Sequence, residues 1–572
     1  MKKILFIVTF VCGGFVANAQ QTTVQVLYPT AIASGYEHSF ADWASTPDMK
    51  EAANRVIAPV VIARDGSATA DSLMCEASTQ DLTGKIALLF RGDCEFGDKA
   101  VNAYNQGAVG IIVVGHTTGE IINMSAGTNL QGDVVDVPVV FIKKEDGAAI
   151  YDALMLGDSV SVLLGNKIGF MPNDIGSVPG FTANVPAQVP VQIAADTDDF
   201  PIRFAAQAYN YGANNQTNIY VTAVINKDGN EFYRDTSNVI PTLVSGDSTD
   251  QFAFTDYEGP LGLGDYEIIY EFVSDSIDDS PNDNKFQYPF RINDDKLFSY
   301  AKYDHDSSFT FNSGNYGPSE RTGDFSSCIT FQDPKASEFG IRGVHFQASV
   351  KDDLPIDGEE ILVQVFKWND QFTFGVDEPS FTDLPSVTGG SYIYQEDLQN
   401  QFVYADMEDY IMLDDNQRYL ICLKIYNENV YVGYDNETKY DYYQSIVERY
   451  LTPIANGSTW YAAGFQGGPM PSLTLDLFTA DEVGLKNAAK LIAANVYPNP
   501  ATDIVNVVVK NYEGAATLTV TDLAGKIVIS NDVAVNANGA ITINTASLTA
   551  GMYIVNMKLA NGNEVKASVV VE

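Results

Sequence analysis

The sequence is poor in the residues that most catalytic and metal sites require. Its 572 residues include only five cysteines, three tryptophans and four histidines, His38, His116, His305 and His345. None of these histidines stands in the His-Glu-x-x-His pattern of zinc peptidases. The glycine-rich surroundings of a subtilisin-type serine and the Gly-x-Ser-x-Gly elbow of many hydrolases are missing as well. The sequence therefore carries no recognisable peptidase or esterase motif.

Positive charge is also scarce. Asp and Glu total 74 against 33 Lys and Arg, which gives a formal net charge of −41 at pH 7. Such a charge disfavours binding to nucleic acid phosphates and to anionic membranes. The composition predicts no nucleic-acid partner, and it is compatible with solubility outside the cell and with calcium binding.

Beyond its first residues the chain lacks an apolar run long enough to span a bilayer, so no transmembrane segment is predicted. The first residues, MKKILFIVTFVCGGFVANAQ, combine two lysines, an apolar stretch over 4–16 and the small-residue pattern Ala-Asn-Ala. This is the pattern of an export signal. We expect residues 1–19 to be a signal peptide, cut between Ala19 and Gln20, so that Cys12 is lost.

Four of the five cysteines remain after this cleavage: Cys75, Cys94, Cys328 and Cys422. In an exported chain an even number favours disulfides, each contributing about 3 kcal/mol to stability. The competing interpretation is a metal site, which would need Cys-x-x-Cys spacing or nearby histidines, and neither is present. Of the three possible pairings we predict the local one, Cys75 with Cys94 and Cys328 with Cys422, because each pair falls inside one candidate domain.

Strands and helices alternate between residues 28 and 164. Phe96, Ala100 and Ala103 recur at helical spacing and predict a helix over 95–106, and a second helix is expected over 144–156. Short apolar runs predict buried strands at 86–90, 109–114, 137–142 and 159–164. The pattern indicates an α/β domain.

Specific motifs accompany this pattern. The run Gly84-Lys85-Ile86-Ala87-Leu88-Leu89-Phe90-Arg91-Gly92 is followed by Cys94, Phe96, Lys99 and, downstream, by Val137-Pro138-Val139 and Asp146-Gly147. In order and spacing these residues resemble the protease-associated (PA) domain. The resemblance implies a domain over 21–170 that binds or positions other molecules. In that family the domain is an accessory of subtilisin-like, zinc aminopeptidase-like and fungalysin-like peptidases, and it also occurs in receptors without proteolytic activity.

From about residue 173 strand-like alternation replaces the helical signals. Apolar runs at 219–225 and 266–273 favour an immunoglobulin-like β-sandwich over 174–294, which resembles the CARDB-like modules of secreted bacterial proteins. Further runs at 359–368 and 419–426 favour a jelly-roll-like sandwich over 296–479.

Two acidic segments in this region could hold a metal. Asp278, Asp279 and Asp283 offer oxygen ligands to calcium, but their spacing is not that of an EF-hand loop, and a solvated turn is favoured. Asp304-His305-Asp306 is a second cluster, but adjacent residues of an extended segment point to opposite faces. A loop is favoured there too. We therefore predict no cofactor, with calcium as a possible ligand of the first segment.

The third region is rich in aromatic residues. Exposed rings on a sandwich can stack on sugars, and five residues are candidates for such contacts: Trp368, Tyr442, Tyr443, Trp460 and Tyr461. Because strands are commonly built from aromatic residues, a role in the core is favoured.

A linker over 480–495 leads to a last block of short strands separated by glycine turns. Its motif residues are Pro498, Asn499, Pro500, Gly525, Gly551, Tyr553 and Lys566. Residues 496–572 resemble the carboxyl-terminal (Por) sorting domain of the type IX secretion system of Bacteroidota. The resemblance implies a small β-sandwich, the secretion machinery as partner, and passage through the periplasm. It also implies release or attachment to surface lipopolysaccharide.

Together these features predict a secreted or cell-surface protein that is not an enzyme and that binds peptide, protein or glycan. One alternative is a secreted hydrolase, a glycosidase or peptidase, with an unrecognised site in the sandwich over 296–479; paired carboxylates would be its chemistry. A third possibility is an accessory that acts on a separate peptidase.

Overall fold

The computed structural model describes residues 22–68, 71–116, 121–197, 199–303, 314–318, 321, 323–351, 354–465, 468–479, 494–509, 514–522, 526–535, 540–559 and 564–572. The predicted cleavage point at Ala19 and Gln20, the Asp304-His305-Asp306 cluster and Gly525 lie outside the described residues. The chain divides into two compact units, 1–336 with 341–477, and 337–340 with 478–572. Each unit is described by itself.

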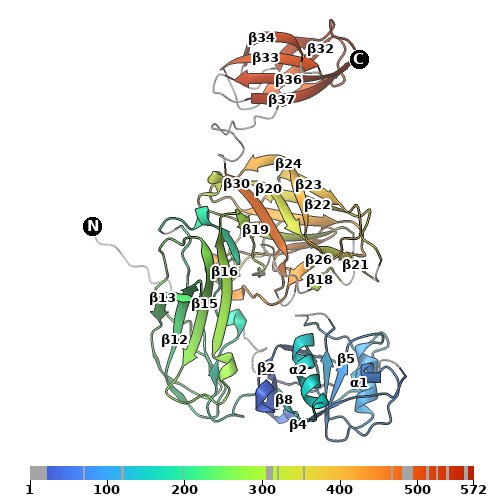
Figure 1. Cartoon of the computed structure of the whole chain (residues 1–572), viewed down its shortest axis with the longest axis vertical. Helices are drawn as coiled ribbons and strands as arrows, with labels where there is room; N and C mark the ends of the chain where they lie inside the picture. Colours follow the sequence, from blue (N-terminus) through green and yellow to red (C-terminus); the bar gives the residue numbers. More distant parts are fainter. Residues whose placement is uncertain are drawn as a thin grey trace, which may run out of the picture. The chain divides into compact units, whose positions relative to one another are not determined.

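An eight-stranded mixed sheet opens the larger unit, in the order β2-β1-β8-β4-β5-β6-β7-β3 (Figure 1). Its central strands are parallel to one another: β4 (Val56–Ile62), β5 (Ile86–Phe90), β6 (Gly110–Val114) and β7 (Val139–Ile142). Its outer strands pair antiparallel: β1 (Thr22–Tyr28), β2 (Gly35–Tyr36), β3 (His38–Phe40) and β8 (Ser161–Asn166).

Two helices cover opposite faces of this sheet. Successive residues of a strand point to opposite sides, so neighbouring residues of β5 pack against different helices. Helix α1 (Phe96–Tyr104) packs Ala100 and Ala103 on one face, together with Leu89 of β5. Helix α2 (Lys144–Met155) packs Ile150 on the other face, against Leu88. The predicted α/β domain is confirmed, and the four strands and two helices expected from the sequence are present with small shifts at their ends.

A second sheet follows in the order β10-β16-β15-β12-β13, with β14 paired to β12 and a separate β9-β11 pair. Its strands are β9 (Ile175–Gly176), β10 (Gln188–Pro190), β11 (Tyr209–Asn210), β12 (Gln216–Lys227), β13 (Asn230–Thr236), β14 (Ile240–Leu243), β15 (Gly264–Val273) and β16 (Lys285–Asn293). The β12–β13 hairpin turns on Asp228 and Gly229. Both have positive φ, 49° and 78°, as a two-residue hairpin turn requires.

The rest of the larger unit contains a ten-stranded sheet, β17-β30-β20-β24-β23-β22-β25-β19-β27-β28, and a four-stranded sheet around β26. The strands are β17 (Leu297–Phe298), β18 (Gly314–Tyr316), β19 (Phe325–Phe331), β20 (Phe339–Phe346), β21 (Ala348–Val350), β22 (Glu360–Lys367), β23 (Ser386–Ile393), β24 (Val403–Met412), β25 (Tyr419–Ile425), β26 (Val430–Asp435), β27 (Ile454–Asn456), β28 (Thr459–Tyr461), β29 (Met470–Pro471) and β30 (Leu473–Thr479). A short helix that the sequence did not predict, α3 (Asp441–Val447), interrupts them.

Both predicted disulfides are confirmed. Cys75 is bonded to Cys94, and Cys328 is bonded to Cys422. The second pair joins directly opposed residues of the neighbouring strands β19 and β25, and both of its cysteines are fully buried.

The smaller unit contains two sheets, β31-β32-β35 and β34-β33-β36-β37. Its strands are β31 (Ala494–Tyr497), β32 (Ile504–Val509), β33 (Gly514–Asp522), β34 (Ile527–Val535), β35 (Ala540–Asn544), β36 (Gly551–Leu559) and β37 (Glu564–Val571). A multidomain chain, α/β first and β-rich afterwards, is therefore confirmed. The boundaries 21–170, 174–294, 296–479 and 480–495 stay predictions.

Two motif residues of this unit have clear structural roles. The side chain of Asn499 accepts a hydrogen bond from the Val570 amide at 2.8 Å and donates one to the Ser568 carbonyl at 3.1 Å, so it fastens the segment around Pro498 and Pro500 to β37. Tyr553 is buried, and its hydroxyl donates to the Thr549 carbonyl at 2.8 Å. Gly551 begins β36 and Lys566 is exposed on β37.

Candidate binding site

A pocket of about 400 Å³ opens where the parallel strands β5 and β6 end. Open α/β sheets characteristically bind ligands at the carboxyl ends of their strands. The pocket is lined from β5 and β6 and the residues that follow them, from helix α2 and from the short η3 turn (Asp71–Leu73). The lining residues are Ser72, Phe90, Arg91, Val114, Gly115, His116, Lys144, Ala148 and Tyr151.

Three of the lining residues of this pocket carry cationic or protonatable side chains. Arg91, His116 and Lys144 all line it, and none of its described lining residues is acidic. Lys144 is also the first residue of α2, a twelve-residue helix that begins without a side-chain cap. The amides of a first helical turn carry a partial positive charge. The described lining of the pocket thus contains cationic side chains and no acidic ones, although the chain as a whole is strongly acidic.

Apart from Ser72 and Gly115, the remaining lining residues contribute apolar or aromatic side chains. The rings of Phe90 and Tyr151 meet edge to face with their centroids 5.6 Å apart. Val114 and Ala148 complete this side. An apolar wall beside a positive one suits a ligand that carries a carboxylate next to an apolar group.

Acidic residues also lie near the start of α2. Glu37 forms an ion pair of 2.8 Å with Lys143. Burial raises the pKa of Asp146 to about 6, so this carboxyl is protonated only below about pH 6 and is mostly ionised at pH 7. The first turn of α2 therefore places acidic side chains next to Lys144.

The segment that carries Ser72 is tied to the segment that carries Arg91. The Cys75–Cys94 disulfide links the two. From α1, the Lys99 ammonium donates to the Leu73 carbonyl at 2.8 Å, and the Asn102 amide donates to the Met74 carbonyl at 3.0 Å. Lys99 is completely buried, and burial lowers its pKa to about 8. This side of the pocket is therefore held by covalent and polar links.

Gly147 allows α2 to lie close to β6. A Cβ atom at this position would stand 2.2 Å from Cγ1 and 2.8 Å from Cβ of Val114. We expect Gly147→Ala to lower the free energy of unfolding by about 1–3 kcal/mol, because the helix must move away from the sheet. Urea denaturation measures this. Gly35→Ala is the control, since its Cβ would make only an ordinary contact of 3.6 Å; equal losses in both variants would contradict the account.

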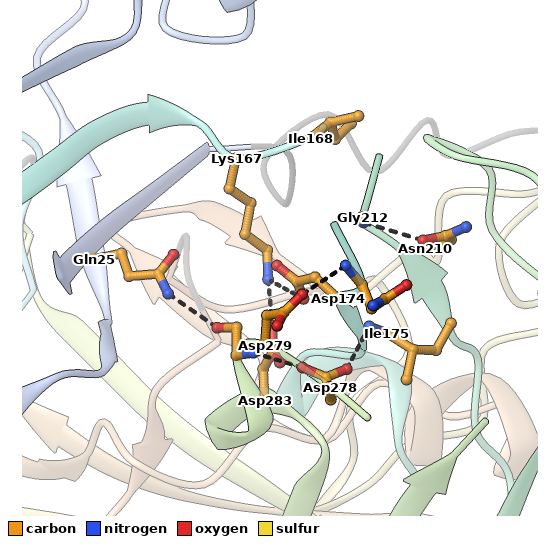
Figure 2. Close-up of polar contacts among 12 residues, drawn as sticks. Gln25, Lys167, Ile168, Asp174, Ile175, Asn210, Gly212, Asp278, Asp279 and Asp283 are labelled. Atoms are coloured by element: carbon orange, nitrogen blue, oxygen red, sulfur yellow. Dashed lines mark hydrogen bonds and ion pairs between the residues drawn. The ribbon is translucent and has the colours of Figure 1, made fainter. Parts of the chain in front are cut away.

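The predicted calcium candidates lie in the turn before β16 (Figure 2). Asp278 accepts hydrogen bonds from the amides of Ile175 and Ser280, both at 2.7 Å, and Asp279 accepts one from the Asn173 amide at 2.8 Å. Asp283 forms an ion pair with Lys167. Among the described residues no group of three or more His, Cys, Asp or Glu side chains is placed to hold a metal ion. Calcium binding by this turn stays a prediction, and calorimetric titration with calcium chloride measures it.

The histidines are dispersed, as the sequence indicates. His38 lies against Phe40, and burial lowers its pKa. His345 lies against Tyr404, and burial lowers its pKa to about 4. His305 is outside the described residues. Of the three histidines that the structure describes, His116 alone lines the pocket. Its position directly after the apolar run of β6 was the available signal.

The aromatic residues of the third region divide between core and surface. Trp368 is 1% exposed and stacks on Phe381, whose ring also stacks on Trp460 with centroids 4.6 Å apart. Tyr442 packs against Phe181, whereas Tyr461 is 49% exposed. The core interpretation is confirmed for Trp368.

The hydrolase alternative requires two carboxylates that face each other. On neighbouring strands of the large sheet, Asp476 accepts a hydrogen bond of 3.0 Å from the Tyr404 hydroxyl and lies 3.4 Å from Arg342. These contacts link the Asp476 side chain of β30 to β24 and β20.

Two protein families match parts of the chain. The PA domain matches residues 56–150, and the secretion system C-terminal sorting domain matches residues 495–572. The chain therefore carries a PA domain, which contains most of the pocket, and a type IX sorting domain. It follows that the protein is secreted or displayed on the outer-membrane surface after passage through the periplasm.

Individual relatives share only short segments with the chain. ER degradation-enhancing alpha-mannosidase-like protein 3 of Homo sapiens is 37% identical over 89 residues, which are 15% of this chain and 10% of that protein. Aminopeptidase YwaD of Bacillus subtilis is 44% identical over 72 residues, 13% of this chain and 15% of that protein. The chain thus spans far less than two thirds of these relatives.

Solved structures show similarly partial likeness. The aminopeptidase from Aneurinibacillus sp. strain AM-1 has 27% identity and a TM-score of 0.20, covering 26% of this chain and 30% of that chain. The β-glucuronidase from Ruminococcus gnavus has 10% identity and a TM-score of 0.15, covering 46% and 38%. At such TM-scores neither likeness bears on function. Within the part of the chain that the structure describes, every helix is too short or too polar to span a membrane.

Proposed function

We propose that this chain is an exported binding protein without catalytic activity, and that its PA domain binds acidic peptide segments in the pocket at the ends of β5 and β6. One observation carries the proposal: Arg91, His116 and Lys144 line the same pocket as the apolar rings of Phe90 and Tyr151. Acidic side chains or a peptide carboxyl terminus supply the matching charge, and a neighbouring side chain fills the apolar part.

A binding role agrees with what the lining residues offer. The described lining has no carboxylate to act as general acid or base. Ser72 and His116 both line the pocket, so a test of function has to include them as possible nucleophile and base. The peptidases among the relatives motivate the choice of peptide as ligand.

The test uses the purified mature protein on an array of acidic, neutral and basic peptides, together with hydrolysis assays on casein, peptides and polysaccharides. We expect retention of acidic peptides and no turnover. Hydrolysis that disappears in Ser72→Ala or His116→Ala would contradict the proposal and assign an enzyme to this pocket.

Variants that each lack one positively charged side chain test whether the peptide binds in the pocket. We expect Arg91→Ala and Lys144→Ala each to weaken the binding of an acidic peptide by about tenfold, because each removes one charge-assisted contact. Fluorescence anisotropy measures the affinity. Lys85→Ala is the matched control: Lys85 precedes the amino end of β5, and its ammonium donates to the Asp81 carbonyl at 2.8 Å. A loss as large in this control would show that net charge, and not the pocket, attracts the peptide.

Attachment to surface lipopolysaccharide is a separate proposal, based on the sorting domain alone. Cell fractionation tests it, because an attached form comigrates with lipopolysaccharide and a released form is found in the medium. Action on a separate peptidase would be one use of the same pocket.

A further inference from the structure

A buried cluster of charges joins the first sheet to the sandwich that follows it (Figure 2). The Lys167 ammonium is ion-paired with both Asp174, at 3.3 Å, and Asp283. It also lies 3.6 Å from the centre of the Tyr211 ring. The Lys167 and Asp174 side chains are 9% and 1% exposed, and that of Asp283 is 26% exposed. The cluster thus has one cation for two acidic groups, in a place that water hardly reaches.

The members of this cluster come from separate parts of the fold. Lys167 follows β8 of the first sheet, Asp174 precedes β9, and Asp283 ends the short turn before β16. The same turn makes two more contacts with the first domain: the Gln25 amide of β1 donates to the Ser280 hydroxyl at 2.9 Å, and the Asn282 amide donates at 2.8 Å to the carbonyl of Ala33, between β1 and β2. We call the turn 278–283 the latch, because its contacts hold these two parts together.

The residues around the carboxyl groups of the latch are closely packed. A Cβ atom at Gly176 would stand 2.6 Å from Cγ of Asp283, so only glycine lets that carboxyl reach Lys167. One oxygen of each acid, Oδ2 of Asp174 and Oδ1 of Asp283, is buried without a hydrogen-bond partner among the described residues. Burying an acceptor without a donor is unfavourable, and a proton on either acid would remove one negative charge from the cluster.

We propose that the latch is a proton-operated switch, which takes up one proton on closing and opens more readily as the pH rises. Burial, with the nearby charges of Asp283 and Asp278, raises the pKa of Asp174 to about 7. The closed latch therefore holds a proton at pH values where an exposed carboxyl has lost it.

Lys167 and the two tyrosines beside the cluster do not titrate in this range. Burial lowers the pKa of Lys167, but the two carboxylates outweigh burial and raise it overall, so its charge remains. Burial raises the pKa of Tyr211 well above 10, and that of Tyr209 is raised as well. Asp278 contributes a negative charge from the latch itself and is held by two backbone amides.

The direction of the effect follows from proton linkage. A carboxyl whose pKa is raised in the closed state favours that state at low pH, and this preference is lost as the pH rises from the open-state pKa towards the closed-state pKa. The opening constant should therefore increase by about tenfold per pH unit between pH 5 and pH 7 and level off above.

Hydrogen exchange tests this on the full mature protein. The Ser177 amide donates to the Asp283 carbonyl and the Asp279 amide to the Asn173 carbonyl, at 3.0 Å and 2.8 Å, so both report opening. After correction for intrinsic exchange, we expect their protection factors to fall by about tenfold per pH unit from pH 5 to pH 7. Equal protection at pH 5 and pH 8 would overturn the proposal.

Matched variants identify the proton-binding group. Asp174→Asn should flatten the pH dependence, and Asp283→Asn is a second variant with the same expectation if the first does not fold. Asp158→Asn, which removes an exposed carboxylate after α2, should leave the pH dependence of the protection factors unchanged. If the protection factors of both latch variants depend on pH as strongly as those of the wild-type protein, the proposal is overturned. A pH dependence that disappears on adding calcium would overturn it as well, since a metal ion and not a proton would then be the missing partner.

Discussion

Replacing Lys167 with methionine should lower the free energy of unfolding of the larger unit by about 3 kcal/mol or more at pH 8. The reason is that Asp174 and Asp283 lose the one ammonium they share, and removing one partner of a buried ion pair leaves uncompensated charge. Methionine retains the apolar stem, so the loss reports charge more than packing. Urea denaturation measures it.

Two comparisons make this result specific. At pH 5 the loss should be smaller than at pH 8, because both acids can be protonated when their counter-ion is gone. Lys335→Met deletes the same charge at a site that is 43% exposed, where Lys335 pairs with Asp199 at 2.7 Å. Exposed pairs contribute at most about 1 kcal/mol. Equal losses in the two variants would contradict the assignment of Lys167 as the counter-ion of the latch.

The second large effect is expected for the disulfide beside the pocket. Replacing Cys75 and Cys94 with alanine should lower the free energy of unfolding by about 3 kcal/mol, because the unfolded chain gains freedom. It should also weaken peptide binding, since Ser72 and Arg91 lie in the two segments that this bond joins. Denaturation and anisotropy on the same preparation measure both effects.

Removal of the other disulfide separates stability from binding. Replacing Cys328 and Cys422 with alanine should destabilise the ten-stranded sheet, because these residues join β19 to β25. Peptide affinity should be unchanged, since neither residue lines the pocket. An equal loss of affinity in the two double variants would mean that the pocket responds to general instability.

Local patterns of the sequence were sufficient for much of the fold. The apolar runs at 86–90 and 109–114 became β5 and β6, and the helical spacing of Ala100 and Ala103 became α1. The disulfides followed from the placement of each cysteine pair inside one domain. These strands, helices and disulfides are determined mainly by residues close together in the sequence, so they can be predicted from one sequence alone.

The candidate site depended on sheet order, which local patterns do not contain. Arg91 and His116 line the same pocket because β5 and β6 are adjacent parallel strands, so that their carboxyl ends lie at one edge. The latch was missed for a similar reason. Lys167 and Asp283 are 116 residues apart, and the sequence offered only an acidic turn that was interpreted as solvated or calcium-binding.

Site-specific photo-crosslinking to a labelled acidic peptide tests directly whether the pocket of the PA domain binds such peptides. The crosslinker p-benzoylphenylalanine replaces either Tyr151, which lines the pocket, or Tyr461, which is 49% exposed on β28 of another sheet. We predict that the protein with the crosslinker at position 151 captures the labelled peptide and that unlabelled peptide competes with it. The captured peptide should be recovered uncleaved. Equal capture at both positions, or cleavage of the peptide, would contradict a binding pocket in the PA domain.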